Sequence, residues 1–260
     1  IMTLLIKDFS TGYDNKIIIN KTNFELRESE WIGIIGANGS GKSTLLKGIL
    51  KFNPTFFGDI FLNGQNTKIF SRKSLSQKIA YLPQKINNSL NITVEELVSL
   101  GRSPYKSFWE FNLHEKDLKI TNEAIEILDL TDLKYKYINE LSGGQCQRAF
   151  LAMTLSQDPE ILLLDEPTTF LDINYQLKFL ECINKLIKYK KLSVITVLHD
   201  INLACRFCNR IAIFKEGNLI DIDKPKKVLN KNNLNKAFDI DSYLIETPLG
   251  LQVFPVSKKI

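Results

Sequence analysis

Apolar and polar residues alternate in two segments near the start of the chain, residues 3–9 and 16–26. This period of two is typical of half-buried antiparallel strands. Two other segments, residues 31–35 and 161–164, are continuously apolar, and residues 194–198 are apolar apart from Thr196. A short apolar run predicts a strand that is buried on both faces, as strands of a parallel sheet are. The chain is therefore expected to combine antiparallel strands with a mainly parallel sheet.

Helical spacing replaces the strand patterns in the middle of the chain. Thr93 and Glu96 form the sequence signature of a capping box, which predicts a helix start. Residues 115–129 carry apolar side chains at helical spacing, and residues 143–157 are expected to form a further helix. We expect residues 92–157 to form an inserted, all-helical subdomain.

On either side of this insert, residues 1–91 and 158–260 are expected to form one core. Strands that alternate with helices after residue 158 favour a parallel α/β sheet. The end of the chain mixes short helix and strand signals and predicts no definite element. The remaining expected elements are helices at residues 45–51, 175–190 and 200–208, and strands at residues 60–62, 79–82, 211–214 and 219–222.

Composition and charge narrow the class of protein. The chain has 260 residues, 44% hydrophobic and 24% charged, which fits one domain with an insert or two small domains. Its net charge of +5 comes from 34 basic and 29 acidic residues that are spread along the chain. That spread argues against a nucleic-acid partner and a polybasic membrane anchor, because both need clustered basic residues.

No apolar run approaches the ~20 residues that a membrane-spanning helix needs. The first residues also lack the pattern of a secretory signal. We therefore expect a chain that is soluble by itself and that has any membrane role through a partner.

The four cysteines are Cys146, Cys182, Cys205 and Cys208, and their spacing is irregular. In a chain of this length, irregular cysteines indicate a reduced, cytosolic compartment rather than a disulfide scaffold. Cys205 and Cys208 form a CxxC, but neither a second ligand pair nor a thioredoxin-like context accompanies it. We interpret them as structural residues on one face of a helix.

A glycine-rich segment, Gly36-Ala-Asn-Gly-Ser-Gly-Lys-Ser43, matches the phosphate-loop pattern GxxxxGK[ST]. A buried strand precedes it and a helix follows it, which is the context that this pattern requires. Glycines let successive backbone N–H groups surround a phosphate, Lys42 reaches the β- and γ-phosphates, and the Ser43 hydroxyl binds Mg²⁺. The alternative is a glycine-rich turn with a solvated lysine. The nucleotide-binding residues expected here are Gly36, Asn38, Gly39, Ser40, Gly41, Lys42, Ser43 and Thr44.

Two carboxylates, Asp165 and Glu166, end the apolar strand at residues 161–164. Ligands of parallel sheets bind beyond the carboxyl ends of the strands. Asp165 is therefore placed to hold Mg²⁺, and Glu166 to polarise an attacking water. A solvated acidic turn before Pro167 is the alternative.

Leu141-Ser-Gly-Gly-Gln145 narrows the class further, since it resembles the signature motif of ATP-binding cassette (ABC) ATPases. Ser142 is a good N-cap, and Gly143 and Gly144 leave the N–H groups of the helix start open to an anion. The resemblance implies that Ser142, Gly143, Gly144 and Gln145 close over the γ-phosphate bound by an opposite subunit. An ordinary helix cap is the alternative.

Further residues match the family in the same order along the chain. Tyr13 resembles the aromatic residue that stacks on adenine, and Gln84 the glutamine that contacts Mg²⁺ and signals to the transmembrane partner. Leu171-Asp172 resembles the loop that acts across the dimer, and His199 the switch histidine on the γ-phosphate. A turn tyrosine and a surface glutamine are the alternatives for the first two. His114 has no such context and is expected at the surface.

The resemblance covers essentially the whole chain and implies an α/β fold. It consists of a P-loop NTPase core with a mixed, mainly parallel sheet, an antiparallel β subdomain and the helical insert. ATP and Mg²⁺ are the implied cofactors, with Lys42, Gln84, Glu166 and His199 catalytic and Ser43, Gln84 and Asp165 at the metal. The sequence departs from the family pattern at Ser29, Ala37 and Cys146, where the family commonly has glycine, proline and a basic residue. These departures remove no catalytic group, so the resemblance predicts an active ATPase.

Two segments point to a branch of the family. Leu100-Gly-Arg-Ser-Pro-Tyr105 and the short tail from Ala237-Phe238 to Pro255-Val256 resemble subunits of iron–siderophore, haem or cobalamin importers. This implies an ATP-induced homodimer on transmembrane permease subunits, peripheral on the cytoplasmic side of the membrane. A substrate-binding protein would then be an indirect partner. A non-transport ABC ATPase of repair, cluster assembly or translation, and a nucleotide-binding regulator without turnover, remain alternatives.

Overall fold

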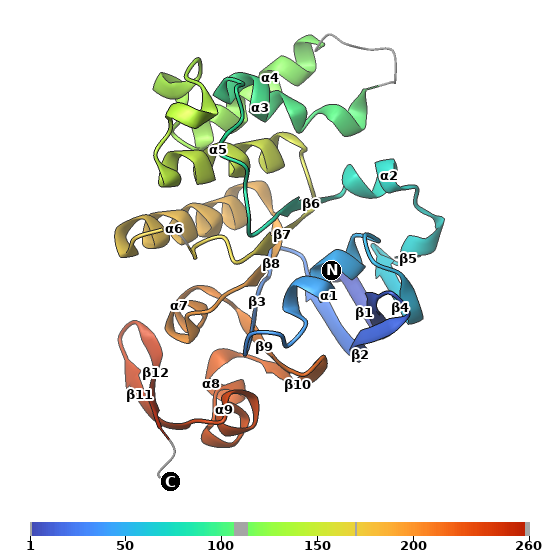
Figure 1. Ribbon diagram of the computed structural model, residues 1–260, viewed down its shortest axis with the longest axis vertical. Helices are drawn as coiled ribbons and strands as arrows, with labels where there is room; N and C mark the ends of the chain where they lie inside the picture. Colours follow the sequence, from blue (N-terminus) through green and yellow to red (C-terminus); the bar gives the residue numbers. More distant parts are fainter. Residues whose placement is uncertain (1, 107–113, 170, 258–260) are drawn as a thin grey trace. The chain divides into compact units, whose positions relative to one another are not determined.

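The computed structural model describes residues 2–106, 114–169 and 171–257 (Figure 1). These residues form two compact units. The first unit comprises Ile1–Phe70 and Ile187–Ile260, and the second comprises Ser71–Leu186. Each unit is described by itself.

The first unit contains an antiparallel sheet with the strand order β2-β1-β4-β5. The two alternating segments predicted near the start are confirmed as its longest strands. Their inward side chains, such as Leu4 and Leu26, are fully buried, which explains the alternation. Asn63 and Gly64 form the turn between β4 and β5. The strands are β1 (Met2–Tyr13), β2 (Lys16–Arg27), β4 (Thr55–Leu62) and β5 (Gln65–Asn66).

The first unit also holds a mainly parallel set of strands. Strand β3 (Trp31–Gly36) pairs in parallel with β8 (Ser193–Val197) and with β9 (Arg210–Lys215). The hairpin partner of β9 is β10 (Asn218–Asp223), which is antiparallel. Every residue of β3 and β8 is buried, so their largely apolar sequences reflect cover on both faces.

Two helices of the first unit differ from prediction at both ends. Helix α1 (Lys42–Ile49) starts three residues earlier than expected, because Gly41 serves as its N-cap in the left-handed region, with φ 93°. Helix α7 (Ile201–Phe207) ends one residue before Cys208, so the two cysteines of the CxxC do not both lie in the helix. Both cysteines are buried and free, as their structural interpretation requires.

The C-terminal part of the first unit contains the elements that the sequence did not predict. They are the helices α8 (Pro225–Val228) and α9 (Lys231–Phe238) and the hairpin of β11 (Asp241–Thr247) and β12 (Gly250–Val256). Helix α9 packs against β9 and β11, and α7 packs against β12. The hairpin therefore packs on both α7 and α9.

The second unit consists of two parallel strands and a group of helices. Its strands β6 (Ile79–Leu82) and β7 (Ile161–Asp165) are those predicted. Helices α3, α4 and α5 pack against one another. The capping box of Thr93 and Glu96 at the start of α3 is confirmed. The helices are α2 (Arg72–Ser76), α3 (Val94–Leu100), α4 (Glu115–Ile127), α5 (Gly143–Ser156) and α6 (Ile173–Lys190), whose last turn crosses into the first unit.

Short 3-10 turns join these elements. They are η1 (Thr67–Ile69) in the first unit and η2 (Ser103–Tyr105), η3 (Thr131–Leu133) and η4 (Ile138–Glu140) in the second. The predicted fold class, a mixed sheet with an antiparallel subdomain and a helical segment, is confirmed.

The segment Leu100–Tyr105 has a packing role within the helical group. Arg102 is only 3% exposed; its Nε donates to Asp117 Oδ1 at 2.8 Å and its guanidinium to the Ser156 carbonyl at 2.7 Å. A Cβ on Gly101 would lie 2.1 Å from the Met153 carbonyl oxygen, so only glycine fits there. This segment thus joins α3, α4 and α5, which explains its composition independently of any partner.

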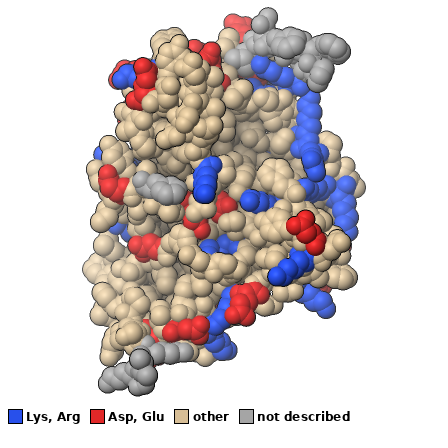
Figure 2. Space-filling model, viewed as in Figure 1, with Lys and Arg blue, Asp and Glu red and all other residues tan. Residues whose placement is uncertain are grey.

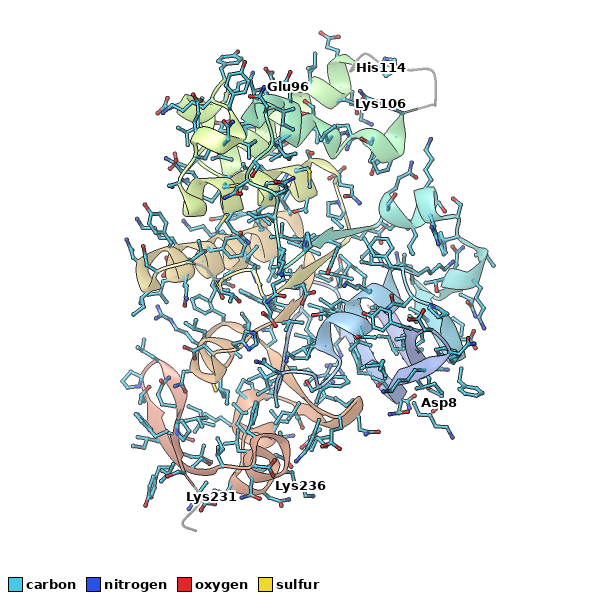
Figure 3. All side chains as sticks on the ribbon, viewed as in Figure 1. Asp8, Glu96, Lys106, His114, Lys231 and Lys236 are labelled. Atoms are coloured by element: carbon cyan, nitrogen blue, oxygen red, sulfur yellow. The ribbon has the colours of Figure 1, made fainter. Side chains whose placement is uncertain are left out.

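Charged side chains of both signs are interspersed over the face drawn in Figure 2. His114, which precedes α4, is exposed as predicted (Figure 3). In the part of the chain that the structure describes, we find no helix with the length and apolar character of a membrane span.

Candidate nucleotide site

The phosphate loop begins where β3 ends and leads directly into α1. A Cβ on Gly36 would lie 2.3 Å from the Phe214 carbonyl oxygen, and one on Gly41 would lie 2.7 Å from Ile19 Cδ1. Both positions therefore lack room for a side chain. Asn38 and Gly39 are exposed, so the outer curve of the loop faces solvent. The loop is a closed, tightly packed turn with its backbone at the start of a helix.

Lys42 and Thr44 are held by neighbours inside the first unit. Lys42 is buried, and its Nζ donates to the carbonyl oxygens of Gly36 and Ala37 at 2.9 and 3.0 Å. The Thr44 hydroxyl donates to the Tyr13 hydroxyl at 3.2 Å. Tyr13 ends β1 and is 39% exposed, so it lies against α1 and keeps an accessible surface for stacking.

His199 and the phosphate loop lie at the same edge of the parallel strands. Ile34 pairs with Val197, and the Leu198 N–H donates to the Ile34 carbonyl at 3.0 Å, so β3 and β8 end together. His199 follows directly and is exposed. The first unit thus brings the phosphate loop, Tyr13 and His199 to neighbouring positions, in agreement with the rule for parallel sheets.

Two parallel strands of the second unit bring its acidic residues and Gln84 together. Asp165 ends β7 as a buried carboxylate and accepts a hydrogen bond of 3.0 Å from the Tyr81 hydroxyl. Gln84 follows the end of β6, and its amide donates to the Glu166 carboxylate. Because β6 and β7 run in parallel, these groups meet at one edge of the pair.

Glu166 has a constrained backbone beyond β7. Its φ of 51° lies in the left-handed region, which is uncommon for a residue with a side chain. The Thr169 hydroxyl donates to the Glu166 carbonyl at 3.2 Å and stands 3.5 Å from the Glu166 carboxylate. The turn after β7 therefore fixes the direction in which this carboxylate points.

The signature segment forms the start of α5. Ser142 is its N-cap, with a complete capping box: the Ser142 hydroxyl accepts from the Gln145 N–H, and Gln145 Oε1 accepts from the Ser142 N–H at 3.0 Å. Ser142 and Gly143 are exposed, and no atom lies within 4 Å of the position a Gly143 Cβ would take. The helix start is thus open, as its sequence indicated.

Other contacts link the signature helix to the loop after β7. The Gln147 amide donates to the Pro167 carbonyl at 2.9 Å, and the Tyr175 ring lies against Gly144, 3.1 Å from where a Cβ would be. Asp172 caps the first turn of α6 by accepting from the Tyr175 N–H at 3.0 Å. These contacts connect the signature, the Glu166 turn and Asp172 within the second unit.

Sequence reasoning did not single out Tyr81, Gln147, Thr169 or Tyr175. Tyr81, Gln147 and Tyr175 each contact a segment that is distant along the chain, whereas Thr169 bonds to Glu166 three residues before it. Tyr81 carried the clearest signal, a hydroxyl-bearing residue beside the carboxyl end of a strand that leads to Gln84.

The residues of the loop fit a nucleotide. The Ser40 hydroxyl is buried without a hydrogen-bond partner among the described residues, which leaves a polar group for a phosphate oxygen to satisfy. In the second unit Asp165 and Gln84 offer a carboxylate and an amide, and in the first unit Ser43 offers a hydroxyl; each carries an oxygen donor of the kind that Mg²⁺ prefers. No group of three or more His, Cys, Asp or Glu side chains gathers as a metal site within the described residues.

Comparison with known proteins agrees with this geometry. Residues 19–169 match the ABC transporter family. A petrobactin import ATP-binding protein of Bacillus anthracis is 37% identical over 230 residues, covering 88% of this chain and 84% of that protein. An iron(3+)-hydroxamate import ATP-binding protein of Bacillus subtilis is 34% identical over 246 residues, covering 95% and 91%.

A solved structure of an inward-facing metal-chelate type ABC transporter shares the fold. Its TM-score is 0.85, with 23% sequence identity and 99% of each chain covered. The matched segment contains the phosphate loop, Gln84, the signature and both carboxylates. This chain belongs to the ABC transporter family and is one of its ATP-binding, ATP-hydrolysing subunits.

Proposed function

We propose that the chain energises an importer of iron–siderophore, haem or cobalamin-type cargo by hydrolysing ATP as a head-to-tail homodimer. The hydrogen bond between Gln84 and Glu166 is the observation that carries the catalytic part, because it joins the proposed sensor to the proposed base. The relatives named for petrobactin and iron(3+)-hydroxamate import support the cargo class.

In the proposed cycle, the first unit binds the nucleotide. Tyr13 stacks on the adenine, and the backbone N–H groups of residues 36–44 and Lys42 surround the phosphates. Lys42 is buried and already positioned by the Gly36 and Ala37 carbonyls, so it contributes a fixed positive charge. His199, at the same edge, is proposed to contact the γ-phosphate.

The second unit supplies Glu166, Gln84 and Asp165 to act on water and metal, and the first unit supplies Ser43. Ser43, Gln84 and Asp165 would hold Mg²⁺, which would neutralise phosphate charge. Glu166 orients the attacking water and accepts its proton, and the turn with Thr169 keeps its carboxylate in place. Gln84 bonds to this carboxylate and is therefore placed to report its state.

The open helix start at Ser142–Gln145 supports the dimer. One chain has its own phosphate loop, so a second anion-binding helix start is explained by the γ-phosphate of a second copy. Asp172, which caps α6 near this segment, is proposed to act across the same interface. Residues 92–157 are proposed as the inserted signature subdomain, and residues 1–91 with 158–260 as the ATP-binding core.

Transmembrane permease subunits are the proposed partners, with a substrate-binding protein as an indirect one and the chain peripheral on the cytoplasmic side. A pull-down of the tagged chain from detergent-solubilised membranes tests this part. A polytopic partner is expected. Soluble partners alone would favour a non-transport ABC ATPase and leave the ATPase chemistry standing.

The variant Glu166→Gln tests the catalytic part. We expect ATP hydrolysis to fall about 10²–10⁴-fold, because the base is lost, while ATP affinity is retained and an ATP-bound dimer accumulates. Phosphate release, nucleotide binding and sedimentation measure the three effects. Glu126→Gln, an exposed change of the same kind on α4, is the control. Normal hydrolysis in Glu166→Gln would refute the assigned role.

A further inference from the structure

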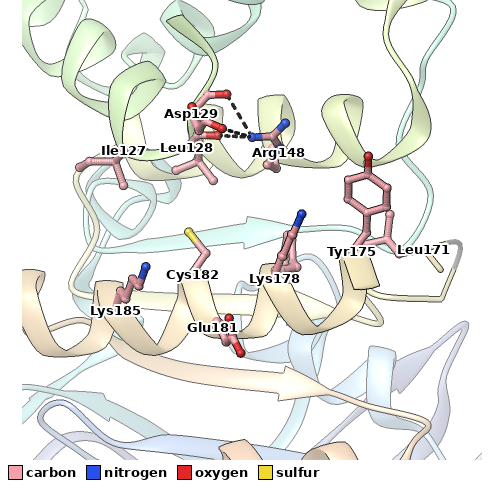
Figure 4. A pocket seen from close by; sticks show the side chains of 12 residues that line it. Ile127, Leu128, Asp129, Arg148, Leu171, Tyr175, Lys178, Glu181, Cys182 and Lys185 are labelled. Carbon is pink, nitrogen blue, oxygen red and sulfur yellow. Dashed lines mark hydrogen bonds and ion pairs between the residues drawn. The ribbon is translucent and has the colours of Figure 1, made fainter. Parts of the chain in front are cut away.

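An unassigned feature of the second unit is a cavity beside the signature helix. It has a volume of about 390 Å³, within the range of small-molecule sites. Its walls come from the end of α4, from α5 and from α6, all inside the second unit. Figure 4 shows Lys178, Cys182 and Lys185 of α6 pointing toward α5, and the guanidinium of Arg148 on α5 directed to Leu128 and Asp129.

Three basic side chains give the cavity a positive lining, namely Arg148, Lys178 and Lys185. Neither lysine makes an ion pair with any residue that the structure describes. Lys178 instead lies 5.7 Å from the centre of the Tyr175 ring. Their charges are thus available to a ligand.

Arg148 is held in place yet keeps an unpaired donor. Its guanidinium donates to the carbonyl oxygens of Leu128 and Asp129 at 2.9 and 3.0 Å. Its Nε is buried and has no hydrogen-bond partner among the described residues. A buried N–H of a cation that is left unpaired is costly, and an anionic oxygen in the cavity would satisfy it.

The two acidic residues of the lining do not neutralise the cavity. The Asp129 side chain is 99% exposed and stands 3.4 Å from Arg148, so solvent screens it. Glu181 points away from α5 in Figure 4. The lining therefore carries three basic side chains against two acidic ones.

The remaining lining is apolar. Leu128 and Phe179 are buried, Leu171 is half-buried, and Ile127 and Tyr175 add exposed carbon surface. Cys182 lies between the lysines and is the one cysteine of the four that is not buried. Burial raises the pKa of the Cys182 thiol, while the charges of Lys185 and Arg148 act to lower it.

We propose that this cavity is a binding site for a small amphipathic anion, an apolar ring or short acyl body that carries one carboxylate, sulfonate or phosphate group. The apolar walls take the body, and Arg148, Lys178 and Lys185 take the charged group.

The cavity also reaches the signature motif, since Gly144 is part of its wall and Tyr175 packs on Gly144. A ligand between α5 and α6 is thus expected to change how the helix start of α5 meets a phosphate. This regulatory step rests on the proposed function, whereas binding itself does not.

Binding is tested on the full chain without nucleotide, by the fluorescence of 8-anilinonaphthalene-1-sulfonate. Its uncharged analogue N-phenyl-1-naphthylamine is the matched probe. The sulfonate is expected to bind about tenfold more tightly, the equivalent of one charge-assisted contact. Lys178→Gln and Lys185→Gln are each expected to weaken the sulfonate several-fold and to leave the neutral probe unchanged. Lys188→Gln, on the exposed end of the same helix, is expected to change neither.

Modification of Cys182 by N-ethylmaleimide locates the probe. Bound sulfonate is expected to slow this modification at least fivefold at saturation, and peptide mass spectrometry assigns the site. Equal affinity for the two probes, unchanged affinity in both lysine variants, or binding without protection of Cys182 would each overturn the proposal. None of these measurements uses ATP, so a failure of the binding proposal can be distinguished from a failure of the catalytic assignment.

Discussion

The phosphate loop and the signature segment are both glycine-containing turns at helix starts, but they are built in opposite ways. Gly36 and Gly41 are crowded by Phe214 and Ile19, and the loop encloses the buried amine of Lys42. Gly143 has no atom within 4 Å of its Cβ position, and the start of α5 is exposed. One turn is completed by its own unit, whereas the other presents open N–H groups outward.

Glycine therefore has a different role in the phosphate loop and in the signature segment. In the phosphate loop, glycine is needed because the surrounding backbone leaves no space. In the signature, glycine keeps a surface bare, so that an anion from outside can approach the helix start. The first is a requirement for folding and binding, and the second is a requirement for assembly.

The largest expected effect comes from Lys42→Ala. Removing the buried charge should weaken ATP binding at least ~100-fold and abolish hydrolysis, because the loop loses its fixed cation. Calorimetric titration measures the affinity, with Lys47→Ala on the same helix as the control. Unchanged affinity in a variant that melts like the parent chain would contradict the loop assignment.

Gly143→Asp is expected to act on assembly alone. The added carboxylate faces solvent at the helix start and would repel a phosphate, so hydrolysis should fall ~10–100-fold. ATP affinity of the isolated chain should stay within about twofold, since the phosphate loop is untouched. Gly143→Ala tests whether the charge or the bulk is responsible. Loss of ATP affinity in Gly143→Asp would show that the segment serves its own chain's nucleotide.

Gly36→Ala and Gly143→Ala make the same chemical change in the two surroundings. The first should destabilise the fold by about 1–3 kcal/mol, because the new Cβ would overlap the Phe214 carbonyl. The second should be neutral or slightly stabilising, since alanine favours a helix and has room. Chemical denaturation measures the free energy of unfolding of both variants. Equal stability would contradict the claim that Gly36 is tightly packed and Gly143 is not.

Ser29→Gly is expected to give the smallest effect. It tests the benefit of glycine from backbone conformation alone, without a steric clash of the side chain. Ser29 has φ 56°, a region in which serine is strained and glycine is not. The substitution should stabilise the chain by about 0.5–1 kcal/mol, read as a rise in melting temperature. Its backbone N–H bond to Ser193 would be kept. A lower melting temperature would indicate that the serine side chain contributes an unrecognised contact.

Much of the fold was readable from the sequence because local patterns and packing agree. The apolar runs of β3, β7 and β8 and the caps at Thr93 and Ser142 each encode the element that forms. Helix α1 was placed too late because Ser43 and Thr44 are weak helix formers, and Gly41 in the left-handed region decides the boundary. The hairpin of β11 and β12 gave no signal, since much of it is exposed and its partners α7 and α9 lie elsewhere in the sequence.

The candidate site was readable as motifs but not as contacts. Lys42, Asp165 and Glu166 stand in strict spacing with strands, so their positions could be predicted. The bonds from Tyr81 to Asp165 and from Gln147 to Pro167 join segments more than fifteen residues apart, and no local pattern encodes them. The cavity lined by Arg148, Lys178 and Lys185 was hidden for the same reason, because it is made by three helices.

The central claim, that the signature of one copy completes the phosphate loop of another, is tested most directly by mixing two inactive variants. A mixed dimer of Lys42→Ala and Gly143→Asp contains one site with both defects and one intact site. Hydrolysis is therefore expected to return to roughly a quarter of the parent rate in an equal mixture, since half of randomly formed dimers are mixed and each has one working site. Hydrolysis no higher than that of either variant alone would mean that each site uses the loop and signature of a single chain, and would contradict the account.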